Sequence, residues 1–317
     1  MTRKARNISV FFRVFPWQNL PEEKIRCTII KEKQMSLDEN WFTEQASPTE
    51  CAFSLHIQKK LHEEETPFQK IAIYETTEFG NLMTLDEMIM LTDRDNFIYH
   101  EMMSHPVLFM HPNPLKVVII GGGDCGTLHE VLKHTTVEKV IEVEIDERVT
   151  RISEQYFPSL CESNDDPRAE FCFQDGIEWM ARAQKNSIDV IIVDSTDPLG
   201  PGEGLFTADF YRDCWRVLTP EGLLVQQSES PLLHLSLLQS IHEAMHKAGF
   251  KTTRSLHFPQ CVYPSGWWTA TVAGNGDLTQ FREKEARNKS FQTRYYNAEI
   301  QKASFALPNF LIEALPD

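Results

Sequence analysis

Acidic side chains follow each of four segments that we expect to form buried strands. The segments are rich in apolar residues, and the turns after them contain no lysine or arginine. The acidic residues of these turns are Asp124, Glu144, Asp146, Asp175, Asp194 and Asp197. In a parallel sheet, ligands bind beyond the carboxyl ends of the strands, so these carboxylates should share one rim. Carboxylates gathered there without basic partners favour a cationic ligand.

The first of these turns is rich in glycine. Residues 115–120 have the composition of a strand buried on both faces, Gly121-Gly122-Gly123-Asp124-Cys125-Gly126 follows, and helical spacing begins at Thr127. A strand, a glycine turn and a helix start a βαβ unit that holds a nucleotide-like ligand at the helix N-terminus. Asp124 would repel a pyrophosphate there. The turn therefore favours a positively charged nucleoside.

Two further acids have positions that suit the polar groups of a nucleoside. Glu144 ends the second strand, where an acid accepts hydrogen bonds from ribose hydroxyls in dinucleotides and sulfonium nucleosides alike. A solvated strand end is the alternative. Asp175 suits a hydrogen bond to an adenine amino group, but capping of a helix that begins at Gly176 would explain it equally well.

Asp194 and Asp197 lie three residues apart in a loop rich in serine, threonine, proline and glycine. Like charges this close cost energy unless a cation neutralises them. A helix cap or a metal pair would also use two acids, but no histidine or further acid lies at ligand spacing, so we expect no metal. A polyamine would neutralise both carboxylates.

Composition narrows the class of partner. The 317 residues include 31 basic and 46 acidic side chains, a formal charge of −15. Nucleic acids and anionic membranes are poor partners for such a chain, because phosphate contacts need clustered lysine and arginine. No apolar run approaches the roughly 20 residues of a membrane span. The seven cysteines are scattered without a C-x-x-C pair, which argues against a disulfide framework and predicts a cytoplasmic protein.

The order of the expected elements predicts an α/β fold. Residues 41–95 are strand-like, with hairpin turn residues at 79–81; residues 96–110 look helical, and prolines mark a boundary at 111–114. Strands then alternate with helices, which predicts a doubly wound, mostly parallel sheet. The expected strands are 116–120, 138–144, 169–174, 188–193, 222–227, 250–258 and 267–272, and the expected helices are 126–134, 147–157, 176–184, 207–217 and 232–248.

Residues 1–34 precede this pattern. Residues 2–15 are basic and lack acids, and their apolar patch at 8–12 is too short for a secretory signal. A transit peptide or a poorly ordered extension would fit; we favour the extension, because Met35 begins a segment that itself reads like a protein start. The expected organisation is an extension (1–34), a β domain with a connecting helix (35–112) and a catalytic domain (113–317).

These motifs resemble those of the spermidine synthase family of aminopropyltransferases, from about Trp41 to the C-terminus. The matching segments are 94–101, 121–124, 143–146, 175–176, 194–198 with 200–201, and 263–266. The resemblance implies a small N-terminal antiparallel β domain, a Rossmann-like (methyltransferase-type) catalytic domain and a homodimer or homotetramer. It also implies transfer of an aminopropyl group from decarboxylated S-adenosylmethionine to putrescine, which gives spermidine and methylthioadenosine without metal or cofactor.

The resemblance further implies a role for individual residues. Asp194 would be the catalytic acid/base residue, and Asp197 would grip the acceptor diamine. Asp124 would hold the amino group of the donor's aminopropyl arm. The other matched residues are Glu144 at the ribose, Asp175 and Gly176 at the adenine, Gln69 and His100 elsewhere on the donor side, and Tyr99, Gln227 and Tyr263 on the acceptor side.

The chain departs from the family's motifs at three places in the site. Cys125 replaces a glycine of the turn, and because cysteine is small we expect little cost. Glu87 replaces a glycine, and Met90 replaces a glutamine that would bind the donor. Trp267-Trp268 replaces smaller residues; these side chains would either narrow the acceptor end or pack the sheet, and we favour packing.

Other functions are compatible with parts of the pattern. A methyltransferase that acts on a small amine would keep the fold, but its donor carries a carboxylate that should avoid Asp124. A nicotinamide-dependent dehydrogenase fits the glycines and Glu144 but not Asp124. A nucleoside-binding protein descended from the enzyme is supported only by Glu87 and Met90. Choice among putrescine, cadaverine and spermidine depends on one or two methylenes, worth about 1–3 kcal/mol, and stays open.

Overall fold

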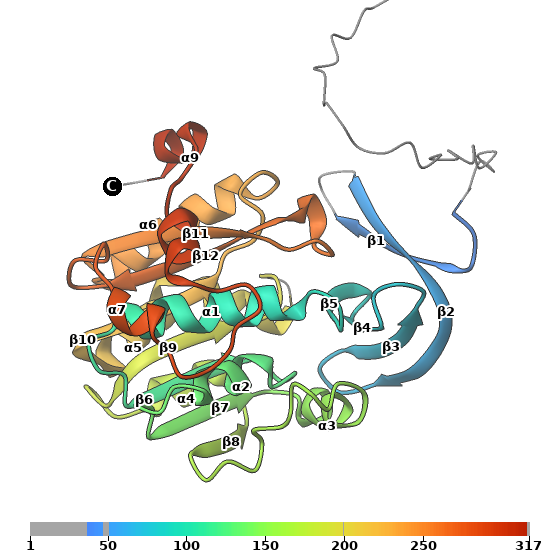
Figure 1. Cartoon of the computed structure of the whole chain (residues 1–317), viewed down its shortest axis with the longest axis horizontal. Coiled ribbons are helices and arrows are strands. Elements are labelled where there is room, and N and C mark those ends of the chain that lie inside the picture. Colours follow the sequence, from blue (N-terminus) through green and yellow to red (C-terminus); the bar gives the residue numbers. More distant parts are fainter. Residues whose placement is uncertain (1–36, 47–50, 199, 316–317) are drawn as a thin grey trace, which may run out of the picture. The chain divides into compact units, whose positions relative to one another are not determined.

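The computed structural model describes residues 37–46, 51–198 and 200–315 (Figure 1). The described residues from Glu39 onward form one compact unit, and all the elements below belong to it. The predicted extension at 1–34 lies outside the described residues. In the part of the chain that the structure describes, no helix is both long enough and apolar enough to span a membrane.

The N-terminal part is a five-stranded antiparallel sheet in chain order, as predicted. The hairpin expected around residues 79–81 is present, and the Thr76 amide donates to the Gly80 carbonyl at 2.9 Å. Gly80 has φ +70°, and a Cβ there would lie 2.5 Å from the Asp93 carboxylate, so this turn requires glycine. The strands are β1 (Trp41–Ala46), β2 (Cys51–Glu65), β3 (Lys70–Thr76), β4 (Asn81–Leu85) and β5 (Met88–Thr92).

The β4–β5 turn is built from two residues in the left-handed region. Asp86 has φ +49° and Glu87 has φ +67°, and Leu85 pairs directly with Met88 across the turn. Two positive φ angles are typical of a hairpin turn that prefers glycine in its second position. Glu87, the residue that stands in place of the family's glycine, therefore carries backbone strain.

We expect Glu87→Gly to raise the free energy of unfolding by about 0.5–1 kcal/mol, because glycine adopts this φ without a Cβ clash. Urea denaturation measures the change. Glu75→Gly is the matched control, since Glu75 lies in strand β3, where glycine should destabilise. Stabilisation by both substitutions, or by neither, would contradict the assignment of strain to Glu87.

The larger sheet has seven strands in the order β11-β12-β10-β9-β6-β7-β8. Neighbouring strands from β10 to β8 pair in parallel, and β12 pairs antiparallel with β10 and β11. All seven predicted strands are confirmed. The strands are β6 (Lys116–Gly121), β7 (Lys139–Glu144), β8 (Ala169–Phe173), β9 (Ile188–Asp194), β10 (Leu218–Gln227), β11 (Thr252–Pro259) and β12 (Trp267–Gly274). β10 begins four residues earlier than expected at 222, because Leu218 pairs with Ile188 before an irregularity in the register.

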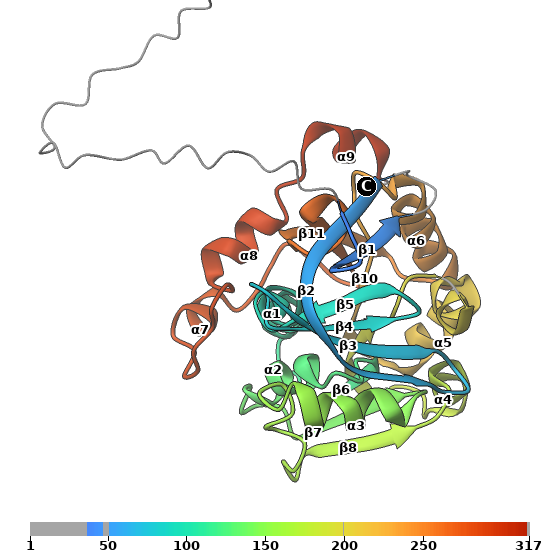
Figure 2. The same ribbon diagram turned by 90° about the vertical axis from the view of Figure 1, so that its right-hand side faces the viewer.

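Helices cover both faces of this sheet (Figure 2). Side chains of β6 alternate between the faces: Val117 and Ile119 pack with one group of helices, and Val118 and Ile120 pack with the other. The helices of the first face are α1 (Asn96–Met110), α2 (Gly126–Leu132) and α8 (Ala298–Ser304). Those of the second are α4 (Gly176–Arg182), α5 (Ala208–Val217) and α6 (Leu235–Ala248). This is the doubly wound arrangement that the alternating pattern predicts.

Two helices connect the sheets. α1 was expected within the N-terminal domain, but its apolar residues pack in the core of the larger sheet, so by its contacts it belongs there. α3 (Glu147–Tyr156) packs through Val149 and Ile152 on the five-stranded sheet. The remaining elements are the 3-10 turns η1 (Gly200–Phe206) and η2 (Pro264–Gly266) and the helices α7 (Glu283–Arg287) and α9 (Asn309–Ala314).

Candidate active site

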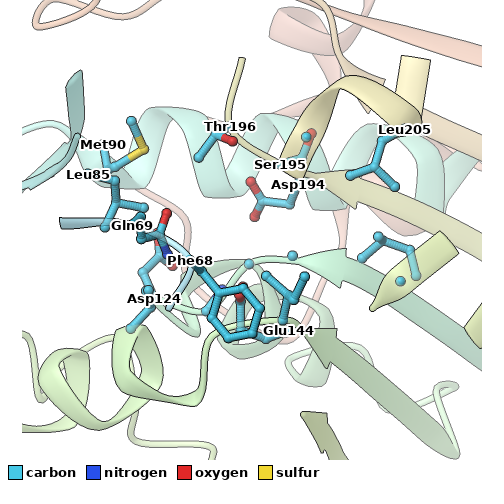
Figure 3. Close-up of a pocket in the computed structure, with 18 of the residues that line it drawn as sticks. Phe68, Gln69, Leu85, Met90, Asp124, Glu144, Asp194, Ser195, Thr196 and Leu205 are labelled. Atoms are coloured by element: carbon cyan, nitrogen blue, oxygen red, sulfur yellow. The ribbon is translucent and has the colours of Figure 1, made fainter. Parts of the chain in front are cut away.

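A cavity of about 380 Å³ lies beyond the carboxyl ends of β6, β7, β8 and β9 (Figure 3). Apolar side chains of the five-stranded sheet and of α4 form much of its wall. The cavity brings together most of the residues predicted to bind a donor or to act in catalysis. They are Gln69, Asp124, Glu144, Asp175, Gly176 and Asp194.

The glycine turn places the backbone against the end of β9. Gly121 and Gly122 have φ of +81° and +74°, and the Gly122 amide donates to the Asp194 carbonyl at 2.8 Å. A Cβ on Gly121 would lie 2.2 Å from that carbonyl oxygen, so only glycine permits the approach. Cys125 also has a positive φ of 67°, which costs a non-glycine residue roughly 1–2 kcal/mol. The expectation of little cost considered only its size and was therefore wrong.

Asp124 is paired with a buried histidine behind the cavity. Its Oδ1 accepts from the Gly126 amide at 2.7 Å, and its Oδ2 lies 3.2 Å from His100 Nε2. Burial opposes the charged form of His100, but the charge and hydrogen bond of Asp124 outweigh it and raise the pKa of the imidazole. His100 does not line the cavity. His100 contacts Asp124 and partly balances the charge of that carboxylate. Any effect of His100 on a donor in the cavity would therefore be exerted through Asp124.

Glu144 is held from two sides at the end of β7. Its Oε2 accepts from the Gly123 amide at 3.1 Å, and its Oε1 accepts from the Asp146 amide at 2.8 Å. Burial raises the pKa of Glu144 to about 7. The carboxylate is therefore fixed in orientation and lines the cavity rather than solvent.

Asp175 caps α4, which was one of the two alternatives for this residue. Its Oδ1 accepts from the amides of Ile177 and Glu178 at 2.7 and 3.3 Å. The residue also lines the cavity, and its Oδ2 accepts no hydrogen bond from the described residues. Capping and ligand binding are therefore compatible.

Asp194 accepts a hydrogen bond from a side-chain hydroxyl at each of its two carboxylate oxygens. Tyr99 donates its hydroxyl to Oδ1 at 2.6 Å, and Thr127 donates to Oδ2 at 2.6 Å. Burial, and then the charge of Asp124, raises the pKa of Asp194. Thr127 was not singled out from the sequence, since a threonine at the start of a helix gives no signal of a distant partner.

A second cavity of about 150 Å³ adjoins the first. Tyr99, Ser195, Thr196 and Tyr263 line both, so the two cavities share a wall beside Asp194. The four residues predicted for the acceptor side all line this second cavity. They are Tyr99, Asp197, Gln227 and Tyr263.

Three acids and a histidine line the far part of the second cavity. Burial, and then Glu229, raises the pKa of Asp197 to about 9. Glu229 is buried, with His234 Nδ1 3.0 Å from its Oε2. Glu44 accepts from the Ile89 amide at 2.8 Å, and burial raises its pKa to about 7. Glu44 and Glu229 were not predicted from the sequence. Glu229 lies two residues after the carboxyl end of β10, where ligand-binding residues are expected, whereas Glu44 lies on β1 of the other sheet.

Neutral side chains form the rest of the wall of the second cavity. Tyr263 donates its hydroxyl to the Met90 carbonyl at 2.6 Å, and Gln227 Nε2 donates to the Thr196 carbonyl at 3.5 Å. Trp268 packs edge-on against Tyr263, with ring centroids 4.6 Å apart, and lines the cavity. Trp267 packs against His257 and Phe310 instead. Packing was thus the right interpretation for Trp267, whereas Trp268 narrows the cavity.

The raised pKa values of the acids in the second cavity predict that stability depends on pH. A carboxyl whose pKa is raised on folding stabilises the fold fully below its ordinary pKa, and this contribution is lost as pH rises through the folded value. For Glu44 that window runs from 4.5 to about 7. We therefore expect Glu44→Gln to raise the free energy of unfolding by about 1–2 kcal/mol at pH 8 and to have little effect at pH 4.5.

Urea denaturation at the two pH values, without polyamine, measures this difference. Glu178→Gln is the control, because Glu178 is exposed on α4 and its ion pair within the described part of the chain is with Arg182. A Glu44→Gln protein that follows the wild-type pH dependence of stability would contradict the assignment.

Comparison with known proteins identifies the family. Residues 96–283 match the family model of the spermine/spermidine synthase domain, and residues 40–93 match that of the spermidine synthase tetramerisation domain. This chain belongs to the spermidine synthase family. It is thus a polyamine aminopropyltransferase by family, and the resemblance stated from the sequence is confirmed.

Relatives of this enzyme are similar over nearly their full length. The polyamine aminopropyltransferase of Methylococcus capsulatus is 60% identical over 87% of this chain and 97% of its own. That of Nitrosococcus oceani is 62% identical over 87% and 98%. A spermidine synthase crystallised with the transition-state analogue AdoDATO has a TM-score of 0.85 at 37% identity, covering 90% of this chain and 98% of that one. The spermidine synthase of Thermotoga maritima has a TM-score of 0.83 at 36% identity, covering 90% and 97%.

Proposed function

We propose that this enzyme transfers the aminopropyl group of decarboxylated S-adenosylmethionine to putrescine, releasing spermidine and methylthioadenosine. One observation carries the proposal. Two adjoining cavities, both lined by carboxylates and neither lined by lysine or arginine among the described residues, share a wall beside Asp194. Two cationic substrates placed end to end would fill them.

The first cavity suits the donor. Glu144 would accept hydrogen bonds from the ribose hydroxyls, and Asp175 with Gly176 would contact the adenine. Asp124, which directly follows the three glycines of the turn and lines the same cavity, would hold the ammonium of the aminopropyl arm. Gln69 lines the same cavity, whereas His100 would act through Asp124.

The second cavity suits a diamine. Asp197 would bind the acceptor, and Glu44 and Glu229 would attract its distal ammonium. Tyr99, Gln227, Tyr263 and Trp268 would enclose its apolar chain. Burial, and then the neighbouring Glu229, raises the pKa of Asp197 when no cation is bound. A bound ammonium would favour the ionised form of Asp197.

Asp194 would act on the nucleophile. Alkylamines resemble lysine, whose pKa is near 10.4, so the acceptor arrives protonated at neutral pH. Asp194, with Tyr99 as a relay, would take that proton; the amine nitrogen then forms a bond to the methylene carbon as the C–S bond breaks. The sulfonium leaves as a neutral thioether, so the step needs no metal or organic cofactor.

The same evidence suggests how the enzyme assembles. The match of residues 40–93 to a tetramerisation domain supports a homodimer or homotetramer built through the five-stranded sheet. The scattered free cysteines support a cytoplasmic location.

The products of the reaction test the proposal. The purified protein is incubated with decarboxylated S-adenosylmethionine and a panel of putrescine, cadaverine and spermidine, and the products are identified by mass. We expect spermidine and methylthioadenosine in equal amounts, with putrescine the preferred acceptor. Methylated amines formed from S-adenosylmethionine would support a methyltransferase instead, and binding of methylthioadenosine without turnover would support a nucleoside-binding protein.

A further inference from the structure

Asp146 is a buried carboxylate to which the proposed reaction gives no role. It follows β7, two residues after Glu144, and is 2% exposed. Its Oδ1 accepts from the Arg148 amide at 3.1 Å and so caps α3. Its Oδ2 accepts from Thr66 Oγ1 at 2.8 Å and from Gln69 Nε2 at 3.1 Å. Asp146 thus joins the larger sheet to residues nearly 80 positions earlier in the chain.

Its two distant partners belong to the tip of the β2–β3 hairpin. The Thr66 hydroxyl accepts from the amides of Phe68 and Gln69, each at 3.1 Å, and so shapes the turn as well as binding Asp146. Phe68 and Gln69 line the first cavity, as Glu144 does, and these residues are labelled in Figure 3. Phe68 is 39% exposed and lines the first cavity, so its ring is available to cover a ligand bound there.

The rest of the hairpin is held by other contacts. Ile71 and Ile73 of β3 pack with Val149 and Ile152 of α3 in one apolar cluster. Arg148 also bonds Glu64 on β2 at 2.7 Å, at a more exposed site. These contacts hold strands β2 and β3 against α3 without Asp146, whereas the tip at Thr66 and Gln69 is bonded to Asp146.

The same residue orients the ribose carboxylate. The Asp146 amide donates to Glu144 Oε1 at 2.8 Å. One residue therefore connects Glu144 on the floor of the cavity to the hairpin tip that carries Phe68.

We propose that Asp146 is a positioning residue of the donor site, which latches the tip of the β2–β3 hairpin so that Phe68 covers the donor nucleoside held by Glu144. The inference rests on the proposed donor site in the first cavity. It requires that loss of the latch weaken the nucleoside while leaving the acceptor unaffected.

Thr66→Val tests the latch without changing Asp146, α3 or Glu144. Calorimetry with methylthioadenosine and initial rates with decarboxylated S-adenosylmethionine and putrescine are the readouts. We expect the Kd for methylthioadenosine and the KM for the donor to rise about 3- to 10-fold, since valine loses the hydrogen bond to the charged Asp146 together with those from the Phe68 and Gln69 amides that shape the tip. The KM for putrescine and kcat should change less than about twofold.

Three further variants separate positioning from general loss of structure. Asp146→Asn should weaken the donor at least as much as Thr66→Val, and Thr66→Ser, which restores the hydroxyl, should recover the lost affinity. Thr77→Val is the matched control, because the Thr77 hydroxyl bonds His56 Nδ1 at 2.7 Å beyond the other end of β3. That variant should bind methylthioadenosine as the wild type does.

The results of these experiments distinguish failure of the inference from failure of the proposed function. Unchanged binding of methylthioadenosine by both Thr66→Val and Asp146→Asn would overturn the inference while leaving the proposed function intact. An equal rise in the KM values for donor and putrescine, or an equal loss in Thr77→Val, would also overturn it. A wild-type protein that does not bind methylthioadenosine would remove the proposed donor site itself.

Discussion

Asp194→Asn is expected to lower kcat by about 10²- to 10⁴-fold, the usual contribution of a positioned general base. Asparagine matches the shape of aspartate, and its amide can still bond with Tyr99 and Thr127, which lie 2.6 Å from the two carboxylate oxygens. The variant should therefore fold and keep the donor-binding cavity, but its residue 194 can no longer accept the proton of the attacking amine. The variant should bind methylthioadenosine with a Kd within about threefold of the wild type.

Rates from release of methylthioadenosine, together with calorimetry, measure both effects. Asp209→Asn is the control, because Asp209 is exposed on α5 and pairs only with Arg212 among the described residues. Tyr99→Phe tests the relay, and we expect a smaller loss in kcat than for Asp194→Asn. Near-normal turnover by Asp194→Asn would rule out the role assigned to this carboxylate.

Asp124→Asn is expected to weaken decarboxylated S-adenosylmethionine by about 10- to 100-fold, since an ammonium would lose its charged partner. Methylthioadenosine has no aminopropyl arm, so its Kd should change little. The asparagine side chain can still accept from the Gly126 amide, the contact that Asp124 makes at 2.7 Å. The ratio of the two Kd values therefore isolates recognition of the amine from recognition of the nucleoside.

The ligands themselves provide the control for this variant. S-adenosylmethionine carries a carboxylate beside its amine, so Asp124→Asn should weaken it less than the decarboxylated donor. Equal weakening of methylthioadenosine and both donors would show that Asp124 maintains the cavity rather than binding the aminopropyl amine.

The sequence predicted the larger sheet because its elements carry strong local signals. β6 is apolar on both faces, and the glycines that follow permit positive φ, so the strand, the turn and α2 could all be located. Ligands bind beyond the carboxyl ends of parallel strands, and this principle correctly predicted that Asp124, Glu144, Asp175 and Asp194 line one cavity. The place of α1 was harder to predict, because a helix buried on nearly every side has no polar face to indicate its neighbours.

The missing parts of the site depend on contacts between distant segments. Glu44 and Phe68 come from the five-stranded sheet and enter the two cavities only when that sheet packs on the larger one. The hydrophobic periodicity within each segment does not indicate how the two sheets pack on each other. The strain at Cys125 and Glu87 was likewise hidden, because a residue letter shows size and polarity but not the sign of φ. Tyr99 and Tyr263 were selected through resemblance to the family, since single tyrosines carry no such signal.

A crystal structure of the enzyme with methylthioadenosine and putrescine bound together is the most direct measurement of the central claim. We expect the thioether sulfur to face the wall shared by the two cavities, and one putrescine nitrogen to lie within about 2.6–3.2 Å of the Asp194 carboxylate. The other nitrogen should lie among Asp197, Glu44 and Glu229. Putrescine bound outside the second cavity, or a sulfur turned away from the shared wall, would contradict the claim that these carboxylates align two amines for transfer.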